Sequence, residues 1–273
     1  MGTNVPELRR HRGDYGFDGA ITTVAVLSAI GAVGLLFAVL AFIRARSGRV
    51  LSAVLDLVVG LLMLQALPSY LYSTRRGKFA VWAELLDGLQ LRGNERVLDL
   101  GCGLGATLSV VAKAVPSGQA VGLDLWRSQD QSGNSLETAW RNLDIEGVRE
   151  RCEIRTGDMR AVPFPDSTFD LVVSSLAIHN IKGHAERLKA IDEAIRVLKP
   201  GGRLLIADIL RTGTYARRLR ERGMADVVEK RLGWRFWYGA LGTVTGLVTA
   251  TKPKTEVWAP DPGRPARQLR NLG

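Results

Sequence analysis

The segment from Val97 to Gly105 constrains the fold of this chain more than any other. It begins with apolar residues that suit a buried strand, and it then turns through glycines at positions 101, 103 and 105. The residues that follow have apolar side chains at helical spacing. Because glycines between a strand and a helix let a ligand approach the backbone closely, the segment predicts a strand–turn–helix unit that binds a small polar ligand.

Strand and helix patterns alternate along the chain after this segment. Strand-like apolar runs follow at 120–123, 152–155, 169–174, 203–208, 227–231 and 243–251. The alternation predicts an α/β fold with a Rossmann-like, doubly wound sheet that helices cover on both faces. A ligand of such a sheet lies beyond the carboxyl ends of the strands. The residues at or near those ends are Asp99, Gly101, Asp124, Asp158 and Ser174.

The glycine turn also matches the dinucleotide fingerprint G-x-G-x-x-[GA], so the turn alone leaves a nucleotide-dependent oxidoreductase open. The surrounding carboxylates favour S-adenosylmethionine (SAM). Asp99 would bring an anion close to a pyrophosphate, whereas the amine and the sulfonium of SAM tolerate a carboxylate there. Asp124 ends a strand where a carboxylate can accept hydrogen bonds from both ribose hydroxyls. Asp158 ends the next strand, where a carboxylate can accept a hydrogen bond from an adenine amine.

The chain resembles class I SAM-dependent methyltransferases in several motifs, which occur in order and at fitting intervals. These motifs are Val97–Gly105, Asp124, Gly157–Asp158, Phe169–Val172 and Val197–Gly202. The resemblance covers about residues 77–251, and it is closest to the small-molecule branch that methylates quinones, sterols and tocopherols. It implies a seven-stranded sheet whose last strand is antiparallel. It does not account for the apolar residues before the domain or for the loop at 126–133.

The resemblance also implies which residues surround the methionine part of the cofactor. Gly101 and Gly103 would line this part. Asp99 would face its amine, directly or through water. Ser174 and the residues after it would approach the sulfonium, so the reacting methyl group is expected at the end of the fourth strand.

The nucleoside part of SAM would lie against the ends of the second and third strands. Asp124 would hold the ribose, with Leu125 or Trp126 against the adenine. Asp158 and Met159 would bound the adenine on its other side. All of these roles come from the family resemblance and are expectations for this chain.

The candidate for acid–base chemistry is His179, which follows the fourth strand. Methyl transfer from a sulfonium is an in-line displacement, so the enzyme mainly aligns the acceptor and excludes water. A general base is needed only if the acceptor must lose a proton. The alternative is a histidine that shapes its loop or touches the cofactor. His179 and His184 lack the acidic neighbours of a metal site, so we expect no metal.

Apolar residues that precede this domain predict a two-helix hairpin at 21–74. Residues 1–20 are polar, and we expect them to form a loose tail. Residues 21–43 carry no charge, and as a helix they would extend about 35 Å, against about 30 Å of bilayer hydrocarbon. A second apolar run at 50–72 contains Asp56, which is costly in lipid. We therefore predict transmembrane helices, the alternative being a soluble or interfacial hairpin.

Charge sets the expected partners and the expected topology. A net charge of +10 fits nucleic acid, an anionic membrane or an arginine-rich proteome. The sequence has no nucleic-acid-binding signature, so we expect no nucleic-acid partner. Basic residues flank the hairpin more densely than they occupy its loop: Arg9, Arg10, Arg12, Arg75, Arg76 and Lys78 against Arg44, Arg46 and Arg49. With a cytosolic cofactor, this predicts a multi-pass protein of the cell membrane with a cytoplasmic catalytic domain.

The leading hypothesis is a membrane-anchored, SAM-dependent methyltransferase with a hydrophobic small-molecule or lipid acceptor, such as a prenylated quinone or phenol. An enzyme anchored in lipid commonly meets a lipid-soluble substrate, and the aromatic residues at 234–238 could line an apolar pocket. The alternatives are a non-catalytic SAM-binding module that recruits a partner through the hairpin, and an oxidoreductase. A basic, proline-rich tail is expected at 252–273. The sequence indicates neither the methylated atom nor the oligomeric state.

Overall fold

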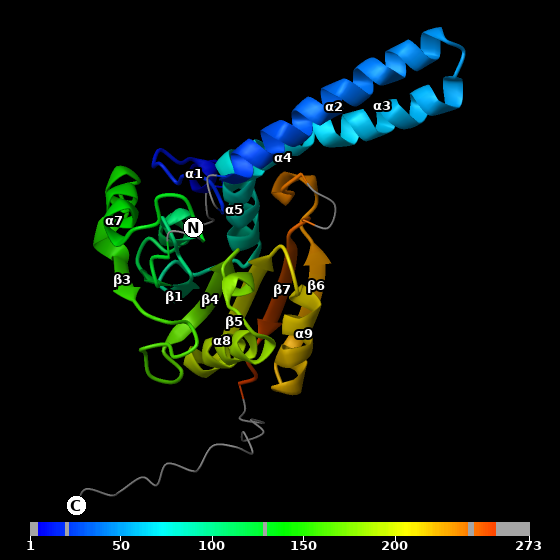
Figure 1. The fold of residues 1–273 in the computed structure, drawn as a ribbon. Helices are drawn as coiled ribbons and strands as arrows, with labels where there is room; N and C mark the ends of the chain where they lie inside the picture. Colours follow the sequence, from blue (N-terminus) through cyan, green and yellow to red (C-terminus); the bar gives the residue numbers. More distant parts are fainter. Residues whose placement is uncertain (1–4, 20–21, 128–129, 240–242, 255–273) are drawn as a thin grey trace, which may run out of the picture.

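The computed structural model describes residues 5–19, 22–127, 130–239 and 243–254. A sheet with helices on both faces forms the body of the molecule, and a pair of long helices projects away from it (Figure 1). Most of the expected C-terminal tail, from residue 255 onward, lies outside the described residues.

The sheet has seven strands in the order β3-β2-β1-β4-β5-β7-β6. The strands are β1 (Arg96–Leu100), β2 (Gln119–Asp124), β3 (Cys152–Thr156), β4 (Phe169–Ser175), β5 (Leu198–Asp208), β6 (Ala225–Arg231) and β7 (Gly246–Thr251). Strands β1 to β5 pair in parallel, whereas β7 runs antiparallel to both β5 and β6. The predicted α/β fold with an antiparallel last strand is confirmed.

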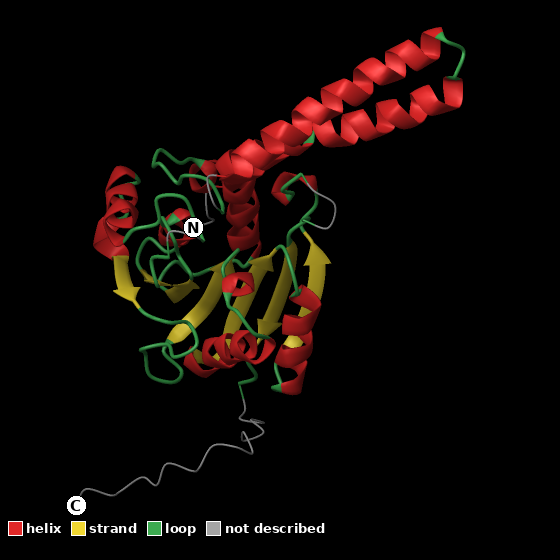
Figure 2. Cartoon of the chain, in the orientation of Figure 1, coloured by secondary structure: helices red, strands yellow, loops and turns green. Residues whose placement is uncertain are grey.

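Helices pack on both faces of the sheet, as Figure 2 shows in red around the yellow strands. These helices are α5 (Lys78–Gly88), α6 (Ala106–Ala114), α7 (Leu136–Ile145), α8 (His184–Val197) and α9 (Thr212–Glu221). Successive residues of β1 belong to two different apolar clusters, Val97 to the one that contains α5 and α6, and Leu98 to the one that contains α8 and α9. Because side chains alternate along a strand, a sheet buried on both faces requires the continuous apolar runs seen in the sequence.

The projecting helices are α2 and α3, and the second of them continues into the body. The chain runs through α2 (Thr22–Arg46), α3 (Val50–Leu64), α4 (Ala66–Tyr72) and a π-helical turn (Ser73–Gly77) into α5. Gly34 and Gly60 let the two helices approach closely, since a Cβ on either would lie 2.9 Å from the carbonyl oxygen of the other. Near the tip, Arg44 pairs with Asp56 at 2.6 Å. The charge of Asp56 is therefore balanced within the hairpin.

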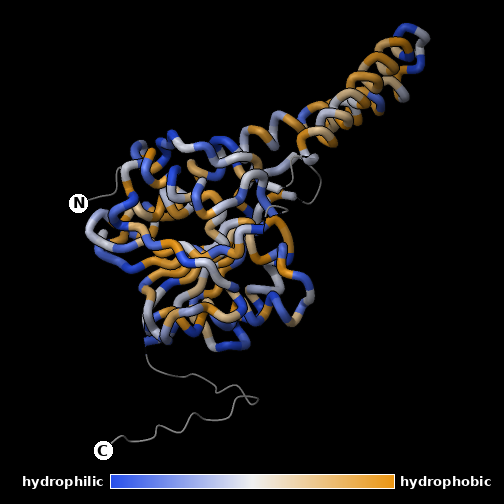
Figure 3. The backbone as a smooth tube through the Cα atoms, turned by 60° about the vertical axis from the view of Figure 1, so that its left-hand side comes forward, coloured by the Kyte–Doolittle hydropathy of each residue, from blue (hydrophilic) through white to orange (hydrophobic). Residues whose placement is uncertain are grey.

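Both α2 and the longer helix that begins at Val50 are long and apolar enough to cross a membrane. Large apolar side chains on them are exposed: Val33, Leu35, Leu36, Val39, Phe42, Ile43, Leu51, Val54, Leu55, Val58, Leu61 and Leu62. The hydropathy colouring of Figure 3 shows hydrophobic residues along the part of the hairpin that stands clear of the body. An exposed apolar surface of this extent marks a membrane or protein contact.

Residues 5–19 pack on the body, in contrast to the loose tail predicted for residues 1–20, of which residues 1–4 and 20 lie outside the described part. This segment contains a short helix, α1 (Val5–Arg9), and it buries Leu8 and Tyr15. The ring of His11 stacks on Phe79 with 3.8 Å between ring centroids. The prediction failed because scattered apolar and aromatic residues in a polar stretch have no periodicity. They are buried only where the tertiary structure provides a surface for them.

Candidate active site

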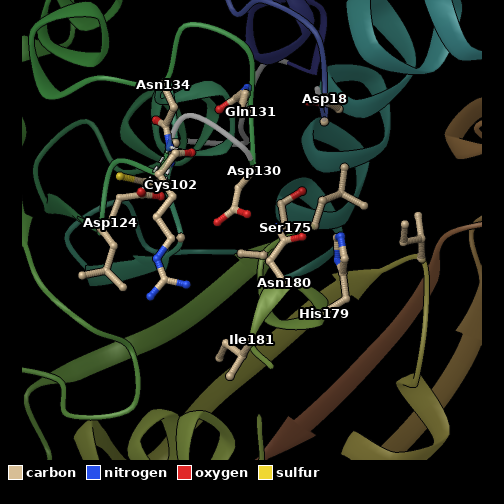
Figure 4. A pocket seen from close by; sticks show the side chains of 18 of the residues that line it. Asp18, Cys102, Asp124, Asp130, Gln131, Asn134, Ser175, His179, Asn180 and Ile181 are labelled. Atoms are coloured by element: carbon tan, nitrogen blue, oxygen red, sulfur yellow. Dashed lines mark hydrogen bonds between the residues drawn. The ribbon is translucent and has the colours of Figure 1, made fainter. Parts of the chain in front are cut away.

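A pocket of about 550 Å³ lies at the carboxyl ends of the parallel strands, within the size range of small-molecule sites. Its walls come from the glycine turn, from the ends of β2, β3 and β4, and from the base of the hairpin (Figure 4). Of the predicted site residues, those that line it are Gly101, Gly103, Asp124, Leu125, Asp158, Met159 and His179. Asp99 and Ser174 are not on its wall.

The glycine turn forms the floor of this pocket. Gly101, Gly103 and Gly105 all have left-handed backbone conformations, with φ of +76°, +50° and +84°. A Cβ at Gly101 would overlap the Cβ of Ala177, and one at Gly103 would overlap the side-chain oxygen of Gln131. The turn therefore requires glycine for its backbone conformation and for close approach. The predicted strand–turn–helix unit is present, with α6 beginning directly after Gly105.

Asp124 is fixed at the end of β2 by the backbone around it. The N–H of Gly103 donates to its Oδ2 at 2.9 Å. The N–H of Trp126 and the side-chain amide of Asn134 donate to its Oδ1 at 2.7 and 3.3 Å. Because each carboxylate oxygen has two lone pairs, Oδ2 of Asp124 keeps a free acceptor site. Leu125 lies beside Asp124 and is 40% exposed. This geometry can accept a hydrogen bond from a ribose hydroxyl.

Asp158 and Met159 line the pocket at the end of β3. The carboxylate of Asp158 accepts hydrogen bonds from the guanidinium and from the backbone N–H of Arg160. The hydrogen bonds from Arg160 are the main reason that the pKa of Asp158 lies below its usual value. An adenine amine would therefore share this carboxylate with Arg160.

Asp99 lies behind the pocket wall, and its carboxylate does not line the pocket. Its side chain is completely buried on the α6 side of β1, and neither carboxylate oxygen has a hydrogen-bond partner among the described residues. Burial first, and then the charge of Asp124, raise the pKa of Asp99 from 3.8 to about 8. A buried acid of this kind is neutral at pH 7.

Ser174 itself does not line the pocket, whereas the residues after it, which the same prediction named, do line it. Its side chain is 1% exposed, and its hydroxyl donates to the carbonyl oxygen of Leu100 at 2.8 Å. The next residue, Ser175, lines the pocket and accepts a hydrogen bond from the indole of Trp82 at 2.9 Å. Successive side chains of β4 point to opposite faces of the sheet, so an error of one residue selects a side chain that is buried in the core and does not line the pocket.

His179 lines the pocket and is held by a carboxylate that the sequence prediction missed. Its Nδ1 lies 2.5 Å from Oδ1 of Asp208, and its backbone N–H donates to Oδ2 of the same residue at 3.0 Å. Asp208 is fully buried at the end of β5 and also accepts from the N–H of Ile209. The position of Asp208 at a strand end was the available signal. Its pairing with His179 depends on the tertiary structure.

The base of the hairpin closes the other end of the pocket through a cluster around Asp18. The carboxylate of Asp18 accepts from Lys78 at 2.7 Å, from Thr74 at 3.1 Å and from the hydroxyl of Tyr238 at 2.7 Å. Burial, followed by the charge of Asp18, raises the pKa of Tyr238 well above its usual value. Nothing in the sequence signals this cluster, because its members come from the N-terminal segment, the hairpin base and the C-terminal connection. Lys78, counted above as a flanking charge, is internal.

The residues of the pocket fit SAM. The glycine turn leaves room that a Cβ would fill, and Asp124 offers an acceptor for the ribose. The wall also holds the carboxylate of Asp130, which suits a ligand with a sulfonium and an ammonium.

Comparison with known proteins finds methyltransferases that are similar to part of this chain. Residues 98–206 match the family described as a methyltransferase domain. Sterol 4-C-methyltransferase strm-1 of Caenorhabditis elegans is 31% identical over 131 residues, which cover 48% of this chain and 36% of that protein. The ubiquinone/menaquinone biosynthesis C-methyltransferase UbiE of a Ruegeria species is 34% identical over 133 residues, which cover 48% of this chain and 50% of UbiE. The match thus spans half or less of each of these curated relatives.

A solved structure shares the fold. The phosphoethanolamine N-methyltransferase 2 of Haemonchus contortus, in complex with SAM, superposes with a TM-score of 0.51 at 18% identity, covering 63% of this chain and 52% of that one. At this identity the likeness concerns the fold alone. Residues 98–206 therefore form a methyltransferase domain on the Rossmann-like fold of class I SAM-dependent methyltransferases, with SAM as its cofactor.

Proposed function

We propose that this protein is a membrane-anchored enzyme that transfers the methyl group of SAM to a hydrophobic small molecule. The observation that carries the proposal is a single pocket that reaches from the glycine turn to the hairpin base. Gly101 and Asp124 line one end, and Leu27 and Tyr70 line the other. A donor at the first end and an acceptor at the second would react within one cavity, which aligns them and excludes water.

The residues of the chain would position and deprotonate the acceptor. When bound, SAM supplies a methyl group on a sulfonium, and the S–C bonding electrons stay on sulfur as the new bond forms. The glycine turn and Asp124 bind and orient the donor. His179 accepts the proton that the acceptor loses. Asp208 accepts a hydrogen bond from Nδ1–H of His179, which leaves Nε2 as the free base.

A hydrophobic acceptor fits the end of the pocket at the hairpin base. Leu27 and Tyr70 belong to a small apolar cluster there, and Tyr238 packs against it. The sterol and quinone names of the curated relatives point to the same class, a ring compound with an apolar part. We infer a prenylated quinone or phenol, or a lipid of similar character.

The hairpin would hold the enzyme in the cell membrane with both chain ends and the catalytic domain on the cytoplasmic side. Its exposed apolar helices and the Arg44–Asp56 pair near the tip support insertion. Alkaline carbonate extraction of membranes is the test, with retention of the full-length protein in the pellet as the expected result. Release into the supernatant would contradict a transmembrane hairpin.

A methyl-transfer assay tests the chemistry. We expect the purified protein, with SAM labelled in its methyl group and a membrane lipid extract, to move label into the organic phase. His179→Ala should keep SAM affinity within about threefold by calorimetry but lose roughly 10²–10⁴-fold in turnover, the usual contribution of a general base. Unchanged turnover in this variant would remove the base assignment.

The same measurements separate the alternatives. Binding of SAM without transfer to any fraction of the extract would favour a non-catalytic SAM-binding module. Binding of NAD without binding of SAM would favour an oxidoreductase and contradict the proposal. Asp144→Ala, which changes a half-exposed carboxylate on α7, is the matched control for variants of pocket carboxylates.

A further inference from the structure

The free part of the hairpin is too short to cross a bilayer by itself. Helix α3 has 15 residues, which extend about 22 Å, against about 30 Å of hydrocarbon. On α2, Leu27 and Ile30 still pack at the hairpin base, so only residues 31–43 stand free before Arg44, again about 20 Å. Tilting shortens the reach further. A spanning hairpin therefore brings its own base down to the edge of the hydrocarbon.

The base cannot separate from the catalytic domain to make up this difference. The side chain of Gln65 donates to the carbonyl oxygen of Gly239 at 3.1 Å, and Ser69 donates to that of Trp237 at 2.9 Å. Ser73 donates to the same Trp237 oxygen. The helix is thus hydrogen-bonded to the connection between β6 and β7 over more than two turns, and the domain surface beside it moves with the hairpin.

That surface has the composition of a membrane interface. Trp234 is 67% exposed and stacks on Tyr72 at 5.2 Å between ring centroids. The guanidinium of Arg75 lies 4.9 Å from the ring centroid of Phe17, and Arg76 beside it is exposed. Tryptophan and tyrosine concentrate at the headgroup level of bilayers, and arginine binds anionic lipid there. We call this surface, made of Phe17, Tyr72, Arg75, Arg76 and Trp234, the interfacial face.

The pocket ends next to this face. Thr23 and Leu27 on α2 and Tyr70 on α4 line it, together with Tyr238. Thr23 is half-buried in the first turn of α2. Leu27, one turn further along α2, belongs to the same apolar cluster as Tyr70 of α4. The end of the pocket proposed for the acceptor therefore lies at the depth of the interfacial face.

We propose that the interfacial face docks into the headgroup region of the bilayer, so that the pocket takes its acceptor from the lipid phase. The inference rests on the proposed membrane anchor. It goes beyond an anchor because it places the catalytic domain directly on the membrane, with the interfacial face buried in the headgroup region. An anchor alone would leave the whole surface of the catalytic domain in contact with the cytosol. The acceptor would then move from lipid to pocket without crossing water.

Quenching of tryptophan fluorescence by brominated lipid tests this arrangement. The full-length protein is reconstituted in phosphatidylcholine vesicles with about one-fifth phosphatidylglycerol, in which the acyl chains carry bromine near the carbonyl end. We expect Trp234 to contribute a strongly quenched component, which the Trp234→Phe variant lacks. Trp140→Phe is the matched control, because Trp140 lies on α7 under the guanidinium of Arg149 and away from the hairpin. Its loss should leave the quenched component intact.

The outcomes separate docking from the proposed function. Equal quenching of the wild type and Trp234→Phe, in protein that resists carbonate extraction, overturns docking and leaves the anchor. Protein released by carbonate overturns both. Quenching of Trp234 in a protein that transfers no methyl group supports docking and counts against the chemistry alone.

Discussion

Replacement of Asp99 by Asn should remove a pH dependence of stability that this one buried carboxyl creates. Asp99 is completely buried under α6, and its oxygens have no hydrogen-bond partner among the described residues. Its pKa is raised from 3.8 to about 8, by burial and by the charge of Asp124. The folded protein therefore holds a proton on Asp99 at pH values where the unfolded chain has released it.

The magnitude follows from proton linkage. Because the pKa of Asp99 is raised in the folded state, the stabilisation from its bound proton is complete below pH 3.8 and is lost as the pH rises toward about 8. Between about pH 5 and 7, the free energy of unfolding should fall by about 1.4 kcal/mol per pH unit from Asp99 alone. For a chain of this size that corresponds to roughly 3–5 °C of melting temperature per pH unit. Asn cannot ionise, so the Asp99→Asn variant should lose this dependence of the free energy of unfolding on pH. Burial of the Asn amide changes stability by the same amount at every pH and does not affect the dependence.

Thermal unfolding of the ligand-free protein in detergent micelles, at pH 5, 6 and 7, measures the slope. The difference in melting temperature between wild type and Asp99→Asn should change by the amount above at each step. Asp144→Asn, on a carboxylate that is 52% exposed, should run parallel to the wild type. A constant offset between wild type and Asp99→Asn across the three pH values would refute the buried, protonated state of Asp99.

Four further variants test the site and the hairpin. Gly101→Ala should abolish SAM binding in calorimetry and cost about 1–3 kcal/mol of stability, because φ is +76° there and the new Cβ meets the opposite wall. Asp124→Ala should weaken SAM binding by at least about 100-fold, since a carboxylate with several hydrogen bonds is lost; an unchanged dissociation constant would exclude the ribose assignment. Asp208→Asn should lower turnover by roughly 10²–10⁴-fold while SAM affinity stays within a few-fold, because the imidazole of His179 loses its fixed tautomer. Gly60→Leu should separate α2 from α3 and lower the melting temperature in micelles, whereas unchanged melting would show that the close helix approach contributes little.

Many features of this protein are local, and the sequence determined them by itself. The strand–turn–helix unit at the glycines, the strand positions and the two long apolar helices follow from residue spacing within windows of about ten to twenty residues. The acids at strand ends converge because parallel strands end at one edge of a sheet. Asp124, Asp158 and His179 could therefore be assigned to one pocket before the path of the chain was known.

Only the tertiary structure decided which side chains meet. Asp208 and His179 are 29 positions apart, and Asp18 and Tyr238 are 220 apart, so no spacing rule relates them. At the end of β4, Ser175 faces the pocket and Ser174 does not. Successive side chains of a strand point to opposite faces, so the exact residue at the pocket depends on how the strand is placed in the sheet. The depth of Asp99 also depended on the helix packed over it. Periodicity fixes the direction of a side chain relative to its own element, whereas its neighbours depend on how the elements pack.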